Sequence, residues 1–145
     1  MSYRMRVAFV AVFAVGTAGT ANAEEHRTLY RAHYELKEAQ AELKVASHDF
    51  GGHRVKALEA VDAAIRQIDD CLKAVGDKVG PYKPEMTIYK GYKNHPHIRH
   101  AIVELRASRM EMKEAKHDYG GHREKAIKDI DYAIEQLEKA LEFAK

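Results

Sequence analysis

The sequence HDFGGHR, residues 48–54, returns 69 positions later as HDYGGHR, residues 117–123. Aligning residues 29–75 with residues 98–144 gives 19 identical positions out of 47, which indicates an internal duplication. Residues 48–54 and 117–123 are here called the first and second heptad. Each heptad lies between segments with the periodicity of amphipathic helices. We therefore interpret the heptads as the turns of two helical hairpins.

Apolar residues in both copies recur at intervals of three and four, which places them on one side of each helix. In the first copy they are Leu29, Ala32, Leu36, Leu43, Ala46, Ala57, Leu58, Val61, Ala64, Ile65, Ile68 and Leu72; in the second they are Ile98, Ala101, Leu105, Met112, Ala115, Ala126, Ile127, Ile130, Ala133, Ile134, Leu137 and Leu141. Four such stripes can bury one another. We expect an all-α, up-down-up-down four-helix bundle built from two duplicated αα-hairpins, about residues 27–75 and 96–144.

Residues 1–23 have the pattern of a secretory signal peptide. Arg4 and Arg6 precede an apolar run from Val7 to Val15, and Ala21-Asn22-Ala23 fits the cleavage site. The apolar run is too short to span a bilayer, and no other stretch approaches the ~20 apolar residues that a spanning helix needs. We expect residues 24–145 to be exported, to a periplasm or out of the cell, without an integral membrane segment.

Net charge, cysteine content and histidine content each limit the possible functions. Cleavage removes two of 24 basic and none of 22 acidic residues, leaving 22 of each, so a nucleic-acid partner is not suggested. Cys71 is the only cysteine, and we expect its side chain to be a small buried or half-buried filler. All nine histidines follow residue 23, which makes the charge sensitive to pH between about 5 and 8. Histidine is therefore the residue type that points to function.

Residues 76–95 join the two hairpins and interrupt the helical pattern. They contain Gly76, Gly80, Pro81, Pro84 and Gly91, together with Tyr82, Tyr89 and Tyr92. A connection of this length is longer than an up-down-up-down bundle needs, and such loops are usually functional or loosely ordered.

The predicted topology brings both heptads to the same end of the bundle. We expect His48, His53, His117 and His122 to converge there as ligands of a transition metal. Asp49 and Asp118 would cap the following helices or orient the imidazoles, and the glycine pairs would admit a backbone or a flat ligand. Imidazoles without a thiolate favour Cu, Zn, Ni or Co over calcium and magnesium.

Two further ligand hypotheses remain. A b-type haem held by two histidines across the pseudo-twofold axis is one, whereas a c-type haem is excluded because there is no C-x-x-C-H motif. A weaker second cluster consists of His95, His97 and His100, of which the last two lie three apart on a helix. We expect this cluster at the bundle end opposite the heptads.

The rival interpretation treats the heptads as turns alone, in a structural or protein-interaction bundle. Nucleophile motifs, phosphate loops and repeated E-x-x-H pairs are missing from the sequence, so an enzyme is the least favoured class. The sequence leaves the choice between monomer and homodimer open. The preferred reading is an exported protein that binds a metal ion or small ligand.

Overall fold

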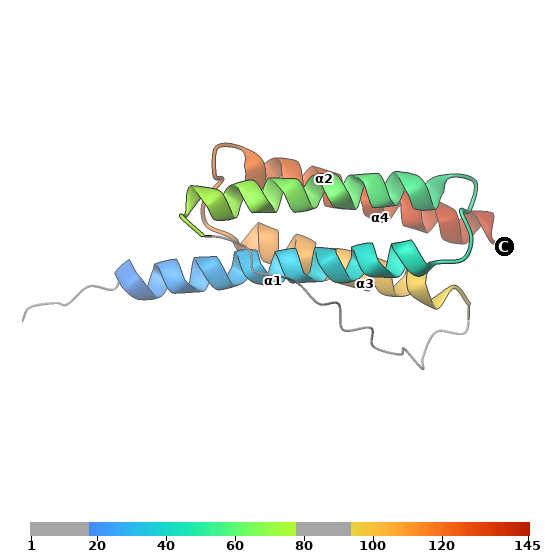
Figure 1. Ribbon diagram of the computed structural model, residues 1–145, viewed down its shortest axis with the longest axis horizontal. Coiled ribbons are helices and arrows are strands. Elements are labelled where there is room, and N and C mark those ends of the chain that lie inside the picture. The colour runs from blue at the N-terminus through green and yellow to red at the C-terminus, as the bar shows by residue number, and fades with distance from the viewer. Residues whose placement is uncertain (1–17, 78–93) are drawn as a thin grey trace, which may run out of the picture.

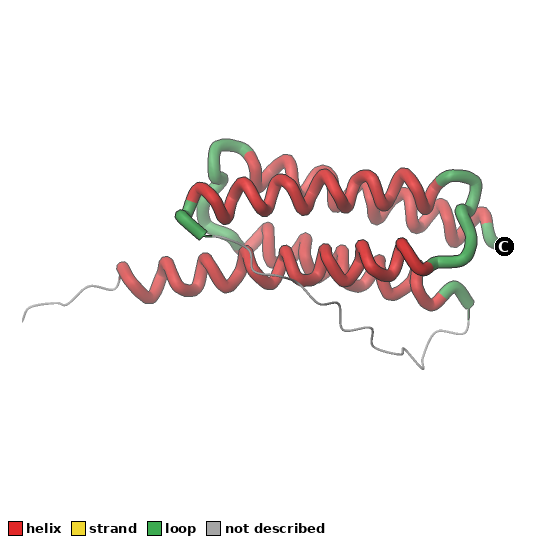
Figure 2. The backbone as a smooth tube through the Cα atoms, in the orientation of Figure 1, coloured by secondary structure: helices red, strands yellow, loops and turns green. Residues whose placement is uncertain are grey.

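A computed structural model of the chain describes residues 18–77 and 94–145. These ranges form four helices, α1 (Ala18–Val45), α2 (His53–Ala74), α3 (Pro96–Glu114) and α4 (His122–Phe143) (Figure 2). None of these helices is long and apolar enough to cross a membrane. Most of the predicted signal peptide, residues 1–17, and residues 78–93 of the predicted connection lie outside the described ranges. Residues 18–23 form the start of α1 in the uncleaved chain.

The helices form a four-helix bundle of two layers, α1 with α3 and α2 with α4 (Figure 1). The contacts within these two layers are the most extensive, and α1 also packs on α2 as α3 does on α4. Both layers therefore join one copy of the duplicated hairpin to the other. All four neighbouring pairs are antiparallel, because α1 and α4 run one way along the bundle and α2 and α3 run the other.

The predicted up-down-up-down order is wrong, and the order is up-down-down-up. His95, just before α3, packs edge-on against Phe50 of the first heptad with ring centroids 4.9 Å apart. Phe143, at the end of α4, lies so close to Gly51 that a Cβ there would sit 3.1 Å from its ring. Since α3 begins and α4 ends at the first heptad, the second heptad lies at the opposite end of the bundle.

The length of the connection explains the difference. A helix of 22 residues, such as α2, is about 33 Å long. The 16 residues between Asp77 and Asn94 can reach more than ~50 Å when extended. The connection therefore has the length to return from one end of the bundle to the other, which a simple turn does not require.

The predicted core is confirmed. Every predicted stripe position is buried except Ala46, Leu58, Ile127 and Leu141, which are partly buried and pack against the core. Full burial of a leucine or isoleucine stabilises the fold by about 1.5–3 kcal/mol. Cys71 is also fully buried, and burial raises the pKa of its thiol to about 12. The thiol stays protonated, as an inert filler would.

The two layers differ in what they bury. Among the described residues, six polar side chains are buried, and five of them belong to α1 or α3: His33, Glu38, Glu42, His100 and Ser108. The α2·α4 layer is built largely from alanine and isoleucine and buries one polar side chain, Gln136. The titratable chemistry of the bundle is therefore concentrated between α1 and α3.

The topology can be tested with spin labels at Val55 and Glu124, two exposed positions near the starts of α2 and α4. Cys71 is buried and should not react, so Val55→Cys and Glu124→Cys supply the labelling sites. Pulsed electron resonance should give a separation of about 30 Å, close to the length of a helix. A separation of about 15 Å, expected for two helix starts at one end of a bundle, would restore the up-down-up-down order.

Candidate metal centre at the first heptad

Both heptads are turns whose backbone demands glycine. Phe50, Gly51 and Gly52 have φ values of 53°, 65° and 86°, and the three corresponding residues of the second heptad have 51°, 68° and 91°. Glycine adopts this left-handed region at little cost, whereas an aromatic residue there is strained. The close approach expected at the glycine pairs occurs at Gly51 alone among the four, and the approaching group is Phe143 of the same chain.

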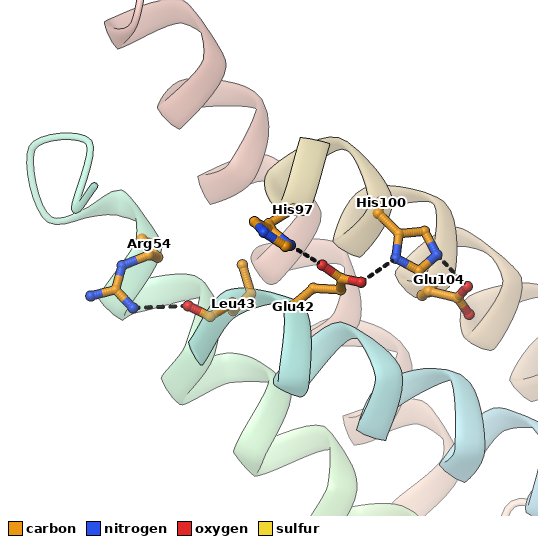
Figure 3. Close-up of polar contacts among 6 residues, drawn as sticks. All are labelled: Glu42, Leu43, Arg54, His97, His100 and Glu104. Atoms are coloured by element: carbon orange, nitrogen blue, oxygen red, sulfur yellow. Dashed lines mark hydrogen bonds and ion pairs between the residues drawn. The ribbon is translucent and has the colours of Figure 1, made fainter. Parts of the chain in front are cut away.

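The predicted N-cap role of Asp49 and Asp118 is wrong. The N-cap positions are Gly52 and Gly121, and no side chain caps either helix. The aspartates contribute their backbone carbonyls instead: Asp49 O accepts from Arg54 N at 3.2 Å, and Asp118 O accepts from the equivalent Arg123 N at 3.1 Å. In the first heptad, Arg54 also donates from Nη1 to Leu43 O at 2.9 Å, which ties the turn to the end of α1 (Figure 3).

The second histidine of each heptad connects α2 to α4. His53 Nδ1 donates to Gln136 Oε1 at 2.9 Å, and His122 Nδ1 donates to Gln67 Oε1 at 2.7 Å. The two bonds are equivalent under the duplication and lie near opposite ends of the layer. The structure therefore does not bring His48, His53, His117 and His122 together at one end of the bundle.

We expect His53→Ala to lower the free energy of unfolding by about 1 kcal/mol, because it removes one partly buried hydrogen bond. A double-mutant cycle with Gln136→Ala, measured by urea unfolding, should give a coupling energy of similar size. His48→Ala, in the same heptad but exposed, is the control and should leave stability unchanged. A coupling energy near zero would mean that the bond does not hold α2 to α4.

A group of three histidines does form, but it differs from the four heptad histidines that the sequence predicted. His48 and His95 lie with ring centroids 6.4 Å apart, and both rings pack edge-on against Phe50. These two histidines and His97 line a pocket of about 200 Å³ together with Ala46, Ser47, Phe50, Pro96 and Ile98. The cluster of His95, His97 and His100, predicted at the end opposite both heptads, thus meets the first heptad. We call His48, His95 and His97 the histidine pocket.

A buried carboxylate, that of Glu42, lies between His97 of the histidine pocket and His100 (Figure 3). Glu42, on α1, is 3% exposed; its Oε2 is paired with His97 Nδ1, and its Oε1 lies 2.8 Å from His100 Nδ1. His100 is itself buried, and its Nε2 lies 2.8 Å from Glu104 Oε1. When His97 donates a hydrogen bond from its Nδ1–H to Glu42, its Nε2 carries the lone pair that can bind a metal.

The three imidazoles share a pocket without yet converging on one point. Within residues 18–77 and 94–145, no group of three or more His, Cys, Asp or Glu side chains is arranged to hold a metal ion. His48 is exposed, and His95 and His97 are partly exposed, so their rings have room to rotate. A metal bound there would have to draw the rings together.

The equivalent end of the second copy lacks most of these groups. His117 packs against Tyr119 with ring centroids 6.0 Å apart, as His48 does against Phe50. The counterpart of His95 is His26, whose Nδ1 pairs with Asp77 at 2.8 Å, and the counterpart of His97 is Thr28. The bundle therefore offers its histidine pocket at one end.

Glu35 occupies the middle of the α1·α3 layer beside two other carboxylates. Its Oε2 is buried without a hydrogen-bond partner among the described residues. Burial, followed by the negative charges of Glu111 and Glu104, raises the pKa of Glu35 to about 7, although Arg31 acts in the opposite direction. The carboxyl of Glu35 is therefore protonated at mildly acidic pH and ionises near neutrality.

This pKa predicts a pH-dependent stability. A carboxyl whose pKa is about 7 when folded and 4.5 when unfolded stabilises the fold fully below the unfolded value and loses that contribution as pH rises to 7. At most about 3 kcal/mol is involved. Urea unfolding should find Glu35→Gln more stable than the unmodified protein at pH 8, with the difference shrinking toward pH 5. Glu59→Gln, at an exposed site on α2, is the control; a difference independent of pH would contradict the assignment.

Our sequence interpretation missed three pairs of polar residues. Gln67 and Gln136, Glu35 and Glu104, and Glu42 and Glu111 are each identical between the two copies. Each pair includes a side chain that the structure uses to join helices or to build the α1·α3 layer. Identity between the copies was a partial signal, because the exposed pairs Lys44/Lys113 and Lys56/Lys125 are identical as well.

Comparison of the chain with known protein families, with curated proteins and with solved structures gave no match. The functional argument therefore depends on the site alone.

Proposed function

We propose that the protein is an exported, non-catalytic four-helix bundle that binds one transition-metal ion in the histidine pocket. The observation that carries this proposal is the meeting of His48, from the first heptad, with His95 and His97, from the start of α3, around one pocket. Export follows from the signal peptide expected in residues 1–23. The ligand set replaces the four heptad histidines that the sequence suggested.

The chemistry of the donors favours particular metals. Three neutral imidazoles suit Cu(II), Zn(II), Ni(II) or Co(II), and a fourth position is left for water or an external ligand. The Glu42 carboxylate on His97 Nδ1 would fix the tautomer of that ring and raise its basicity. The pocket, at about 200 Å³, is below the size range of sites for drug-sized ligands, about 300–1,000 Å³, so it suits an ion better than a haem.

Backbone strain at the pocket supports the same proposal. His95 has a left-handed backbone with a φ of 51°, and so does Phe50, against which its ring packs. Strained non-glycine residues cost about 1–3 kcal/mol each and cluster at functional sites. The strain at Phe50 belongs to the turn, because Tyr119 has the same backbone in the second heptad, so His95 carries this argument.

The test is metal content and affinity of untagged protein purified after export. Near-stoichiometric metal by mass spectrometry, or micromolar or tighter binding of Cu(II), Zn(II), Ni(II) or Co(II) by calorimetry, is expected. His48→Ala and His97→Ala should each weaken binding at least tenfold. His48 is exposed, so its variant should fold normally, as circular dichroism would establish.

The matched control is the double variant His53→Ala with His122→Ala, which removes the same number of imidazoles from the heptads. Its metal affinity should equal that of the unmodified protein, because these side chains bind glutamines between α2 and α4. If the control loses affinity as the pocket variants do, or if the unmodified protein takes up no metal, the histidine pocket is not a metal site.

A further inference from the structure

The outer surfaces of α1 and α3 carry a charge pattern that the overall composition conceals. From His26 to Val45 and from Pro96 to Glu114, one acidic side chain, Glu114, is exposed. Six basic side chains are exposed over the same residues: Arg27, Arg31, Lys44, Arg99, Arg106 and Lys113. The other five glutamates of these segments are buried or partly buried. The chain is neutral as a whole after cleavage, but this layer presents a basic face.

The basic side chains alternate with apolar ones along α3. Arg99, Val103, Arg106, Met110 and Lys113 follow intervals of four, three, four and three residues, which is one continuous stripe on a helix. Val103 is 45% exposed and Met110 is 62% exposed. Apolar side chains that protrude between cations are typical of a helix that lies on a membrane surface.

The duplication repeats the stripe on α1. Tyr30, Tyr34, Lys37, Ala41 and Lys44 occupy the positions equivalent to those five residues. The pseudo-twofold axis runs through the α1·α3 layer, perpendicular to the helices, and relates the two stripes, which lie on the outer sides of these two neighbouring helices. Tyrosine is common where protein meets the headgroup region of a bilayer. The two stripes, with the exposed Arg27 three residues before Tyr30, are here called the α1·α3 face.

The opposite layer has no such bias. From His53 to Ala74 and from His122 to Phe143, six acidic and six basic side chains are exposed. Several of them form ion pairs within one helix, such as Lys128 with Glu124 and Lys139 with Glu135. The α2·α4 layer therefore serves as an internal comparison with the same number of exposed cations.

We propose that the α1·α3 face docks the protein onto an anionic lipid bilayer surface. Arg27, Lys44, Arg99 and Lys113 would lie among the headgroups while Val103 and Met110 reach the acyl boundary, whereas Arg31 and Arg106 are engaged by Glu111 and Glu138. Long basic side chains can keep their charge at the interface while their stems cover apolar surface. Export favours this occupant over nucleic acid, and the proposal does not depend on the histidine pocket.

The experiment is co-sedimentation with vesicles of phosphatidylglycerol and phosphatidylcholine, using protein whose N-terminus after export has been established by mass spectrometry. We expect binding that weakens in high salt and is lost with phosphatidylcholine alone. Each basic residue near an anionic surface contributes about fivefold. The triple variant Arg27→Gln, Lys44→Gln and Lys113→Gln should therefore bind about a hundredfold more weakly.

The matched control is Lys56→Gln, Arg66→Gln and Lys125→Gln, which removes the same charge from exposed sites on α2 and α4. It should bind the vesicles nearly as well as the unmodified protein. Equal losses in the two triple variants would mean that net charge acts without a docking face and would overturn the proposal. Absence of vesicle binding, or tighter binding to duplex DNA than to the vesicles, would also overturn it.

Discussion

The antiparallel packing of one duplicated hairpin against the other is the constraint on which the rest of the structure depends. Each layer joins a helix of one copy to its equivalent in the other, α1 to α3 and α2 to α4. The pseudo-twofold axis is then perpendicular to the helices, so equivalent residues near the helix centres meet, whereas equivalent residues near the helix ends are separated by the length of the bundle. Glu35 and Glu104, which interact electrostatically, and the distant heptads are two results of the same symmetry.

Separation of the two ends has allowed them to diverge. At one end Glu42 faces His97 and His100, while at the other its counterpart Glu111 lies 3.7 Å from Arg31. Arg31 and His100 occupy equivalent positions, but the guanidinium is permanently charged whereas the imidazole can change charge or bind a metal. One end thus holds a fixed ion pair and the other a chemically versatile group.

The sequence predicted the hairpins, the core and the burial of Met112, because helical periodicity reports burial directly. It did not predict the order of the helices, since four amphipathic stripes pack equally well in either topology. Because the helix order was wrong, the predicted grouping of the histidines was wrong as well. His48 was expected beside His117, and it lies beside His95. The length of the connection between the hairpins is the sequence feature that fits the observed topology, but the sequence interpretation related this length to function or loose order.

The buried glutamates of the α1·α3 layer and the basic outer face have one physical cause. A helix of balanced composition that turns its glutamates toward a partner helix must leave its lysines and arginines outside. Burial of those carboxylates is unfavourable unless each accepts hydrogen bonds or is neutralised. Glu42 finds two imidazoles, and Glu35, with a pKa of about 7, retains a proton at mildly acidic pH. The histidines of α3 and the protonation of Glu35 thus offset the cost of the polar layer, and the exposed cations are the consequence on its outer side.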